Sequence, residues 1–192
     1  MAHGRTHGGI VDAIARTWAG PRRAMAGRMA AGLSESRALA DLMLACGLLF
    51  VASLPDARRA AAGLAGETGD PFAAAVAAHL FAWVALAPLA AYGVAALAHL
   101  VARLFGARGG FLPARSALFA ALLAGTPVAL GLALLGVLGD AVPALLPVVR
   151  LVGYAGVAAW LWLAGASLLE AEGFRAGASG PGPVDRGTDH VG

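Results

Sequence analysis

Hydrophobic residues fill four long stretches of the chain, and the charged residues gather between them. A helix needs about 20 residues to cross the ~30 Å hydrocarbon core of a bilayer, and each stretch supplies that length. The first does so only if it extends back to residue 38 and Asp41 lies near the headgroups. The pattern predicts an all-α, polytopic transmembrane helical bundle over residues 38–172. The four predicted spans cover about 38–55, 74–101, 116–138 and 145–169.

Residues 1–37 show a different pattern, in which apolar side chains recur every four positions among arginines. Ile10, Ile14 and Trp18 form one such stripe, which ends at a break at Gly20-Pro21. A basic amphipathic helix of this kind is typical of the membrane surface. The alternative is a cytosolic helix packed on the bundle. On the first interpretation, the residues expected at the interface are Trp18, Arg22 and Arg23.

Glycine and proline dominate the last 20 residues, 173–192. A segment of this composition cannot bury a hydrophobic core, so we expect a disordered tail. At the other end, the long basic region ahead of the first span is not typical of a cleaved signal peptide.

The overall composition agrees with a membrane protein. Hydrophobic residues make up 59% of the 192 residues and charged residues 13%, and the mean hydropathy is +0.76. Soluble globular proteins are far less apolar. The composition therefore argues against a water-soluble domain.

The basic residues indicate the orientation. All 14 are arginine, and eleven lie in the N-terminal region, in the connection between the second and third spans, and in the tail. The positive-inside rule then predicts a multi-pass protein of the inner (plasma) membrane with both termini cytoplasmic. Because these arginines lie beside hydrophobic segments, and not on a basic face interleaved with aromatics, we expect no nucleic-acid partner.

Two prolines interrupt the apolar segments at similar depth. Pro88 and Pro127 lie ~18 to 22 Å from the nearest arginines on the cytoplasmic side, and we expect helix kinks at both. Each proline frees the carbonyl one turn earlier, at Val84 and Leu123. Broken helices at matching depth are one mark of a transporter site, although proline kinks also occur in helices that transport nothing.

Three further polar residues are candidates for a function inside the membrane. His79 and His99 could relay protons or bind metal, but the 20 residues between them place them near opposite interfaces. Asp41 follows Arg37 by four residues, so the two could pair. The favoured interpretation of these charges, and of Glu170 and Glu172 at the end of the fourth span, is that they mark the membrane boundary.

No motif predicts a reaction or a cofactor. The sequence lacks H-E-x-x-H and G-x-S-x-G, and the segment Gly106–Gly110 lacks the lysine of a phosphate-binding loop. The single cysteine, Cys46, lies in an apolar run and is expected to be a buried structural residue. We therefore expect no catalytic, cofactor-binding or metal-binding residues, and an intramembrane enzyme is the least favoured alternative.

Several short motifs resemble the bacterial branch of the Yip family, the Ypt/Rab-interacting-protein domain, over about residues 18–169. The resemblance implies a small polytopic protein with a cytoplasmic N-terminal region and a helical bundle. Eukaryotic members are associated with vesicle trafficking and small GTPases. The motifs are Trp18-Ala19-Gly20-Pro21-Arg22, Ala87-Pro88-Leu89, Tyr92-Gly93, His99-Leu100-Val101-Ala102-Arg103, Phe105-Gly106, Arg108-Gly109, Arg115, Ala117-Leu118-Phe119 and Pro127.

The chain departs from that family in two respects. The family is usually described with five spans, whereas this sequence predicts four. The aspartate-leucine-tyrosine-glycine-proline type motif of the eukaryotic relatives is reduced to Gly20-Pro21, so GTPase binding is not carried over.

These observations predict a non-enzymatic membrane-organising or scaffold component. The expected partners are membrane lipids and either a membrane-protein partner or a second copy of the chain. A small transporter or channel subunit built on the second and third helices remains the alternative.

Overall fold

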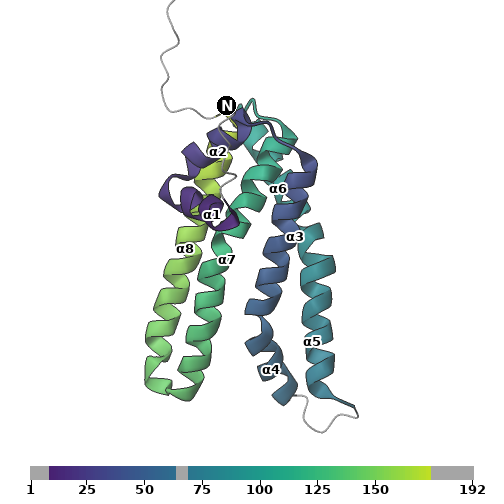
Figure 1. Cartoon of the computed structure of the whole chain (residues 1–192), viewed down its shortest axis with the longest axis vertical. Coiled ribbons are helices and arrows are strands. Elements are labelled where there is room, and N and C mark those ends of the chain that lie inside the picture. The colour runs from purple at the N-terminus through teal and green to yellow at the C-terminus, as the bar shows by residue number, and fades with distance from the viewer. Residues whose placement is uncertain (1–8, 64–68, 174–192) are drawn as a thin grey trace, which may run out of the picture.

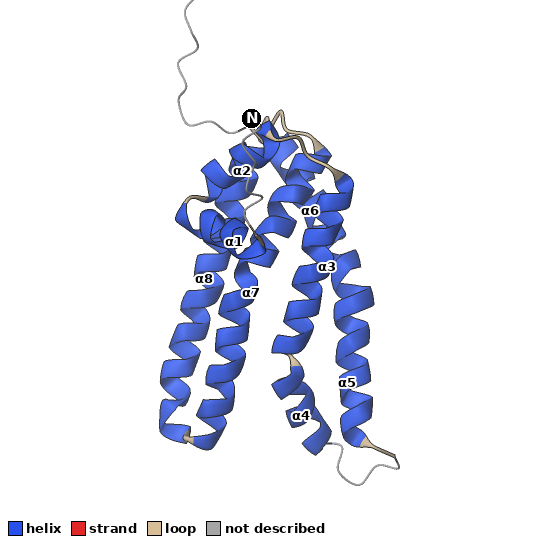
Figure 2. Ribbon diagram, viewed as in Figure 1, coloured by secondary structure: helices blue, strands red, loops and turns tan. Residues whose placement is uncertain are grey.

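The computed structural model describes residues 9–63 and 69–173, and this part of the chain is helical throughout, with no strand (Figures 1 and 2). The predicted all-α class is confirmed. The predicted disordered tail, apart from Gly173, lies outside the described residues. The elements are α1 (Ile10–Ala19), α2 (Pro21–Ala30), α3 (Glu35–Ala52), α4 (Leu54–Gly63), α5 (Pro71–Phe81), the π-helical η1 (Ala82–Leu86), α6 (Ala87–Leu104), α7 (Phe111–Ala141), the 3-10 turn η2 (Pro143–Leu145) and α8 (Leu146–Ala171).

Three continuous helical runs are long and apolar enough to cross a membrane. They are Pro71–Leu104, Phe111–Ala141 and Pro143–Ala171. A fourth candidate is the pair α3 and α4, which is bent by 47° at Ser53. Among residues 9–63 and 69–173 there are therefore three helices able to span a membrane, or four if the bent pair counts as one span.

The bend between α3 and α4 falls inside the predicted first span, 38–55. Pro55 has no backbone N–H and fits best in the first turn of a helix, which is where α4 places it. The hydroxyl of Ser53 donates a hydrogen bond to the Phe50 carbonyl at 2.8 Å and so satisfies an oxygen at the end of α3.

The long helices form two hairpins that meet at one end and diverge at the other (Figure 1). One hairpin is α7 with α8, and the other is α3–α4 with the run from α5 to α6. Both α3 and α8 pack extensively on α7. The core lies where the hairpins meet, around Leu42, Phe119 and Leu163, which are 0% exposed. At the divergent end, Arg59 and Asp140 form an ion pair at 2.8 Å between α4 and α7.

Helical structure continues through both prolines, and each is accommodated differently. Ahead of Pro88 the helix widens into η1, where the Ala87 N–H donates to the Ala82 carbonyl, five residues earlier. Within α7, the carbonyl that Pro127 frees at Leu123 accepts a hydrogen bond from the Thr126 hydroxyl at 2.8 Å. Thr126 is buried, so this carbonyl needs no water. The kinks themselves stay predictions.

Small residues bring α7 and α8 into close contact. The indole Nε1 of Trp160 donates to the Ala121 carbonyl at 3.2 Å, and its ring lies over Gly125. A Cβ at Gly125 would come within 2.7 Å of the Trp160 ring.

Gly125→Ala should therefore destabilise the bundle by about 1 to 3 kcal/mol, the usual cost of overpacking. Gly131→Ala in the same helix is the matched control, because a Cβ there meets nothing within 4 Å. Thermal unfolding in detergent measures both. Equal midpoints for the two variants would contradict the close contact.

Candidate functional site at the end where the hairpins meet

The N-terminal region forms two helices that meet at Gly20-Pro21, and both pack on the bundle. α1 lies against α7, and α2 lies against α8 (Figure 1). The indole Nε1 of Trp18 donates to the Ala124 carbonyl at 2.7 Å, and its ring packs on the core. At the start of α1, Ile10 and Val11 remain exposed. The region is thus packed on the bundle and still presents an apolar edge.

The apolar side chains of α2 pack on the bundle, whereas those of a surface helix would face lipid. Met25 is 2% exposed and packs with Ala117 and Ala171, while Met29 and Leu33 are partly buried against the same cluster. These methionines and Leu33 face the bundle. Arg22 and Arg23 are exposed, whereas Arg28 is directed toward α3.

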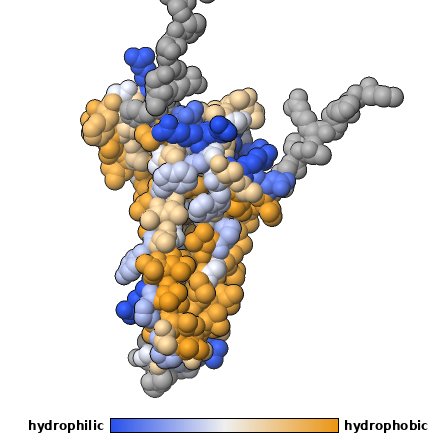
Figure 3. Space-filling view, turned by 90° about the vertical axis from the view of Figure 1, so that its left-hand side faces the viewer, coloured by the Kyte–Doolittle hydropathy of each residue, from blue (hydrophilic) through white to orange (hydrophobic). Residues whose placement is uncertain are grey.

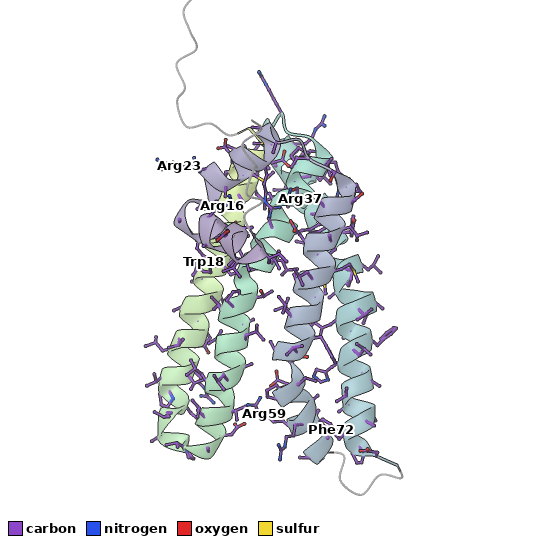
Figure 4. The ribbon with its side chains drawn as sticks, viewed as in Figure 1. Arg16, Trp18, Arg23, Arg37, Arg59 and Phe72 are labelled. Carbon is purple, nitrogen blue, oxygen red and sulfur yellow. The ribbon has the colours of Figure 1, made fainter. Side chains whose placement is uncertain are left out.

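Arginines from three helices line a cavity of about 310 Å³ beside α1 and α2. We call it the arginine cavity. No carboxylate lines it, while Thr17, Ser34 and Ser116 add hydroxyl groups. Figure 4 labels three of its arginines, one on each of α1, α2 and α3. The four arginines are Arg16, Arg23, Arg28 and Arg37.

Asp41 neutralises one of these arginines. Its carboxylate pairs with Arg28 at 2.6 Å, and not with Arg37, with which the sequence spacing would also have allowed a pair. The pair is largely shielded from solvent, with side-chain exposures of 17% and 16%. Within residues 9–63 and 69–173, no carboxylate forms an ion pair with Arg16, Arg23 or Arg37, which leaves three positive charges at the cavity.

A second polar cluster keeps another carboxylate away from the cavity. Glu35, at the start of α3, pairs with Arg115 at 2.8 Å and accepts a hydrogen bond from the Tyr92 hydroxyl at 3.2 Å. The guanidinium of Arg115 also lies over the ring of Phe111, 4.6 Å from its centre. Cation–π contact and ion pairing together fix Arg115, and with it Glu35.

His99 and Glu172 form a buried pair. The Nδ1 of His99 lies 2.7 Å from Oε1 of Glu172, whose side chain is 2% exposed. The interpretation of Glu172 as a boundary charge in solvent is wrong, because the turn after α8 folds it against Gly109. A Cβ at Gly109 would lie 2.6 Å from the Ala171 carbonyl oxygen, so only glycine fits there. The second oxygen, Oε2, has no hydrogen-bond partner among the described residues.

The two remaining predicted residues differ in position, because Arg22 lies on α2 at this end and His79 lies on α5 away from it. His79 bonds through Nδ1 to the Ala75 carbonyl of its own helix at 2.9 Å and does not meet His99. Arg22 is exposed near the start of α2. Across the described ranges, no group of three or more histidine, cysteine, aspartate or glutamate side chains is arranged to hold a metal ion.

Comparison with known proteins gives no match: no family model, no curated protein and no solved structure is similar to this chain. The resemblance to the Yip family therefore stays a prediction from the motifs. Several motif residues do gather at this end of the bundle. They include Trp18, Tyr92, His99, Gly109 and Arg115.

Proposed function

We propose that the protein is a non-enzymatic, Yip-like component of the inner (plasma) membrane that organises the membrane by binding anionic lipids through α1 and α2. Both termini are cytoplasmic in this proposal. The observation that carries it is the arginine cavity, in which three arginines have no carboxylate partner within the described part of the chain. Uncompensated arginines at the end of a membrane bundle attract anionic headgroups.

The position of α1 supports this proposal. Trp18 contacts Ala124, which lies nine residues after Arg115 in α7, or ~14 Å along the helix axis. At this depth the indole lies below the arginines, on the hydrocarbon side, and its N–H is paired with a carbonyl of the bundle. The exposed side chains of Ile10 and Val11 can then contact the lipid hydrocarbon, while the arginines remain near the headgroups.

The experiment compares the full-length protein in nanodiscs of phosphatidylcholine alone and of phosphatidylcholine mixed with phosphatidylglycerol. Amide hydrogen exchange over residues 10–30 should be slower with phosphatidylglycerol. Raising the salt to 1 M should remove most of the difference, because the Debye length falls to ~3 Å.

Arg16→Gln/Arg37→Gln should lose much of this protection, since each arginine near an anionic surface contributes about 1 kcal/mol. Arg58→Gln, an exposed arginine on α4 at the other end, is the matched control and should behave like the wild type. Identical exchange in the two lipid mixtures would overturn the proposed function.

The proposed orientation has its own test. Reporter fusions after Gly66, Ala107, Ala141 and Ala178 should read outside, inside, outside and inside, as the arginine distribution predicts. An outside result at Ala178 would contradict four spans and favour five. An outside result at Ala107 would invert the proposed placement of α1 and α2.

The transporter alternative loses part of its basis at Pro127. The carbonyl of Leu123 already has the Thr126 hydroxyl as a partner, and both residues are buried. A solute path would have to use other groups.

A further inference from the structure

A second cavity, of about 670 Å³, opens where the start of α2 overhangs α8. We call it the α2–α8 groove. Its upper wall is the Gly20-Pro21 turn with Arg22 and Arg23, and its lower wall is an apolar strip of α8. Figure 3 faces this side of the molecule and shows hydrophilic residues at the upper end above a largely hydrophobic surface. The strip consists of Trp162, Gly165, Ala166 and Leu169.

The apolar strip runs along the membrane normal of the proposed orientation. Leu169 lies two residues before the end of α8, and Trp162 lies nine residues before it. The strip therefore descends ~10 Å, from the headgroup level into the hydrocarbon. Trp162 is 59% exposed and Leu169 42%, so both offer apolar surface.

We propose that the α2–α8 groove holds one anionic phospholipid, with its phosphate against Arg22 and Arg23 and one acyl chain along Trp162, Gly165 and Leu169. The inference rests on the proposed function and adds a defined binding site for a single lipid, which we call the lipid seat. Charge complementarity identifies the occupant, because the groove has two arginines and no carboxylate above an apolar floor. A free phosphate would leave that floor uncovered, and an uncharged hydrocarbon would leave the arginines without a counter-ion.

The groove and the arginine cavity can be tested separately. Arg23 lines both, Arg22 lines only the groove, and Arg16 and Arg37 line only the cavity. Gly165 is a further position for a test substitution, because a Cβ there meets nothing within 4 Å. A large side chain at Gly165 would fill the groove without meeting the interior.

The experiment is native mass spectrometry of the full-length protein, stripped of lipid in mild detergent and then mixed with one phospholipid at a time. We expect one phosphatidylglycerol retained per chain and no retained phosphatidylcholine. Gly165→Phe should abolish retention. Gly153→Phe, in the same helix and equally free of contacts, is the matched control and should keep the lipid.

The arginines supply a second test that does not depend on packing at Gly165. Arg22→Gln/Arg23→Gln should weaken phosphatidylglycerol binding roughly thirtyfold, about fivefold for each arginine. Arg16→Gln/Arg37→Gln should leave the retained lipid in place. Glycerol phosphate, the soluble headgroup, should not displace the lipid, and displacement at equal concentration would show a phosphate site in place of a lipid seat.

The two proposals fail in different ways. Retention of phosphatidylglycerol by both Gly165→Phe and Arg22→Gln/Arg23→Gln, or equal retention of phosphatidylcholine by the wild type, overturns the lipid seat. Lipid-dependent protection of residues 10–30 would still stand in that case. Conversely, a retained lipid without any change in hydrogen exchange would support the seat and overturn the proposed function.

Discussion

Replacing Trp18 with alanine should release α1 from the bundle. The indole of Trp18 donates to the Ala124 carbonyl at 2.7 Å, and its ring packs against the core where α3 and α7 meet. Removing a packed tryptophan costs about 3 kcal/mol or more. We expect a lower thermal midpoint in detergent and rapid proteolysis within residues 10–33, at a protease concentration that leaves the wild type intact.

Two further variants separate the contributions of Trp18. Trp18→Phe removes the hydrogen bond and keeps most of the ring, so it should cost about 1 kcal/mol. Tyr154→Ala is the control, because Tyr154 is 73% exposed and does not line the α2–α8 groove. Equal proteolysis of Trp18→Ala and Tyr154→Ala would show that Trp18 does not anchor α1.

His99→Ala should be about as destabilising, by about 3 kcal/mol. Glu172 is buried, and one of its two oxygens already lacks a partner among the residues described. Without His99, the other oxygen also loses its partner, and removing one member of a buried pair costs several kcal/mol. Thermal unfolding in detergent measures the loss. His79→Ala is the matched control, with an expected cost of about 1 kcal/mol, because its ring bonds only to a carbonyl of its own helix.

A double variant tests the cause. His99→Leu/Glu172→Met should recover most of the stability, since apolar residues of similar size often replace a buried pair at little cost. A double variant as unstable as His99→Ala would show that the histidine acts by packing against Phe111, which its ring meets edge to face.

The helices could be predicted from the sequence because their causes are local. Apolar runs of membrane length produced the helices of Pro71–Leu104, Phe111–Ala141 and Pro143–Ala171, which are four to eight residues longer than the predicted spans. The bend at Ser53 was missed, although Pro55 marks it. A proline two residues after a serine was a usable signal for a new helix start.

The partners of the charged residues could not be predicted, because they depend on how distant helices meet. Sequence spacing allows Arg37 as a partner of Asp41, but α2 brings Arg28 into contact with it. Glu172 looks like a boundary charge in the sequence, and its burial depends on the close approach of Gly109. Tertiary contacts of this kind leave no periodic pattern in the chain.

The partner of the carbonyl freed by Pro127 could have been predicted from the sequence. Thr126 immediately precedes Pro127, and a threonine hydroxyl often bonds to a carbonyl three or four residues earlier. That local bond closes the gap at Leu123. Met25, Met29 and Leu33 also recur every four residues, but periodicity cannot show whether lipid or protein covers the face that they form.

The contact between Trp18 and Ala124 also sets an order of events on the ribosome. The two residues are 106 positions apart, so α7 emerges long after α1. At synthesis rates of about 5 to 20 residues per second, the delay is roughly 5 to 20 s. In the proposed orientation, the arginines of α1 and α2 would contact the membrane surface before the bundle forms, so lipid binding would precede the packing of α1 on α7.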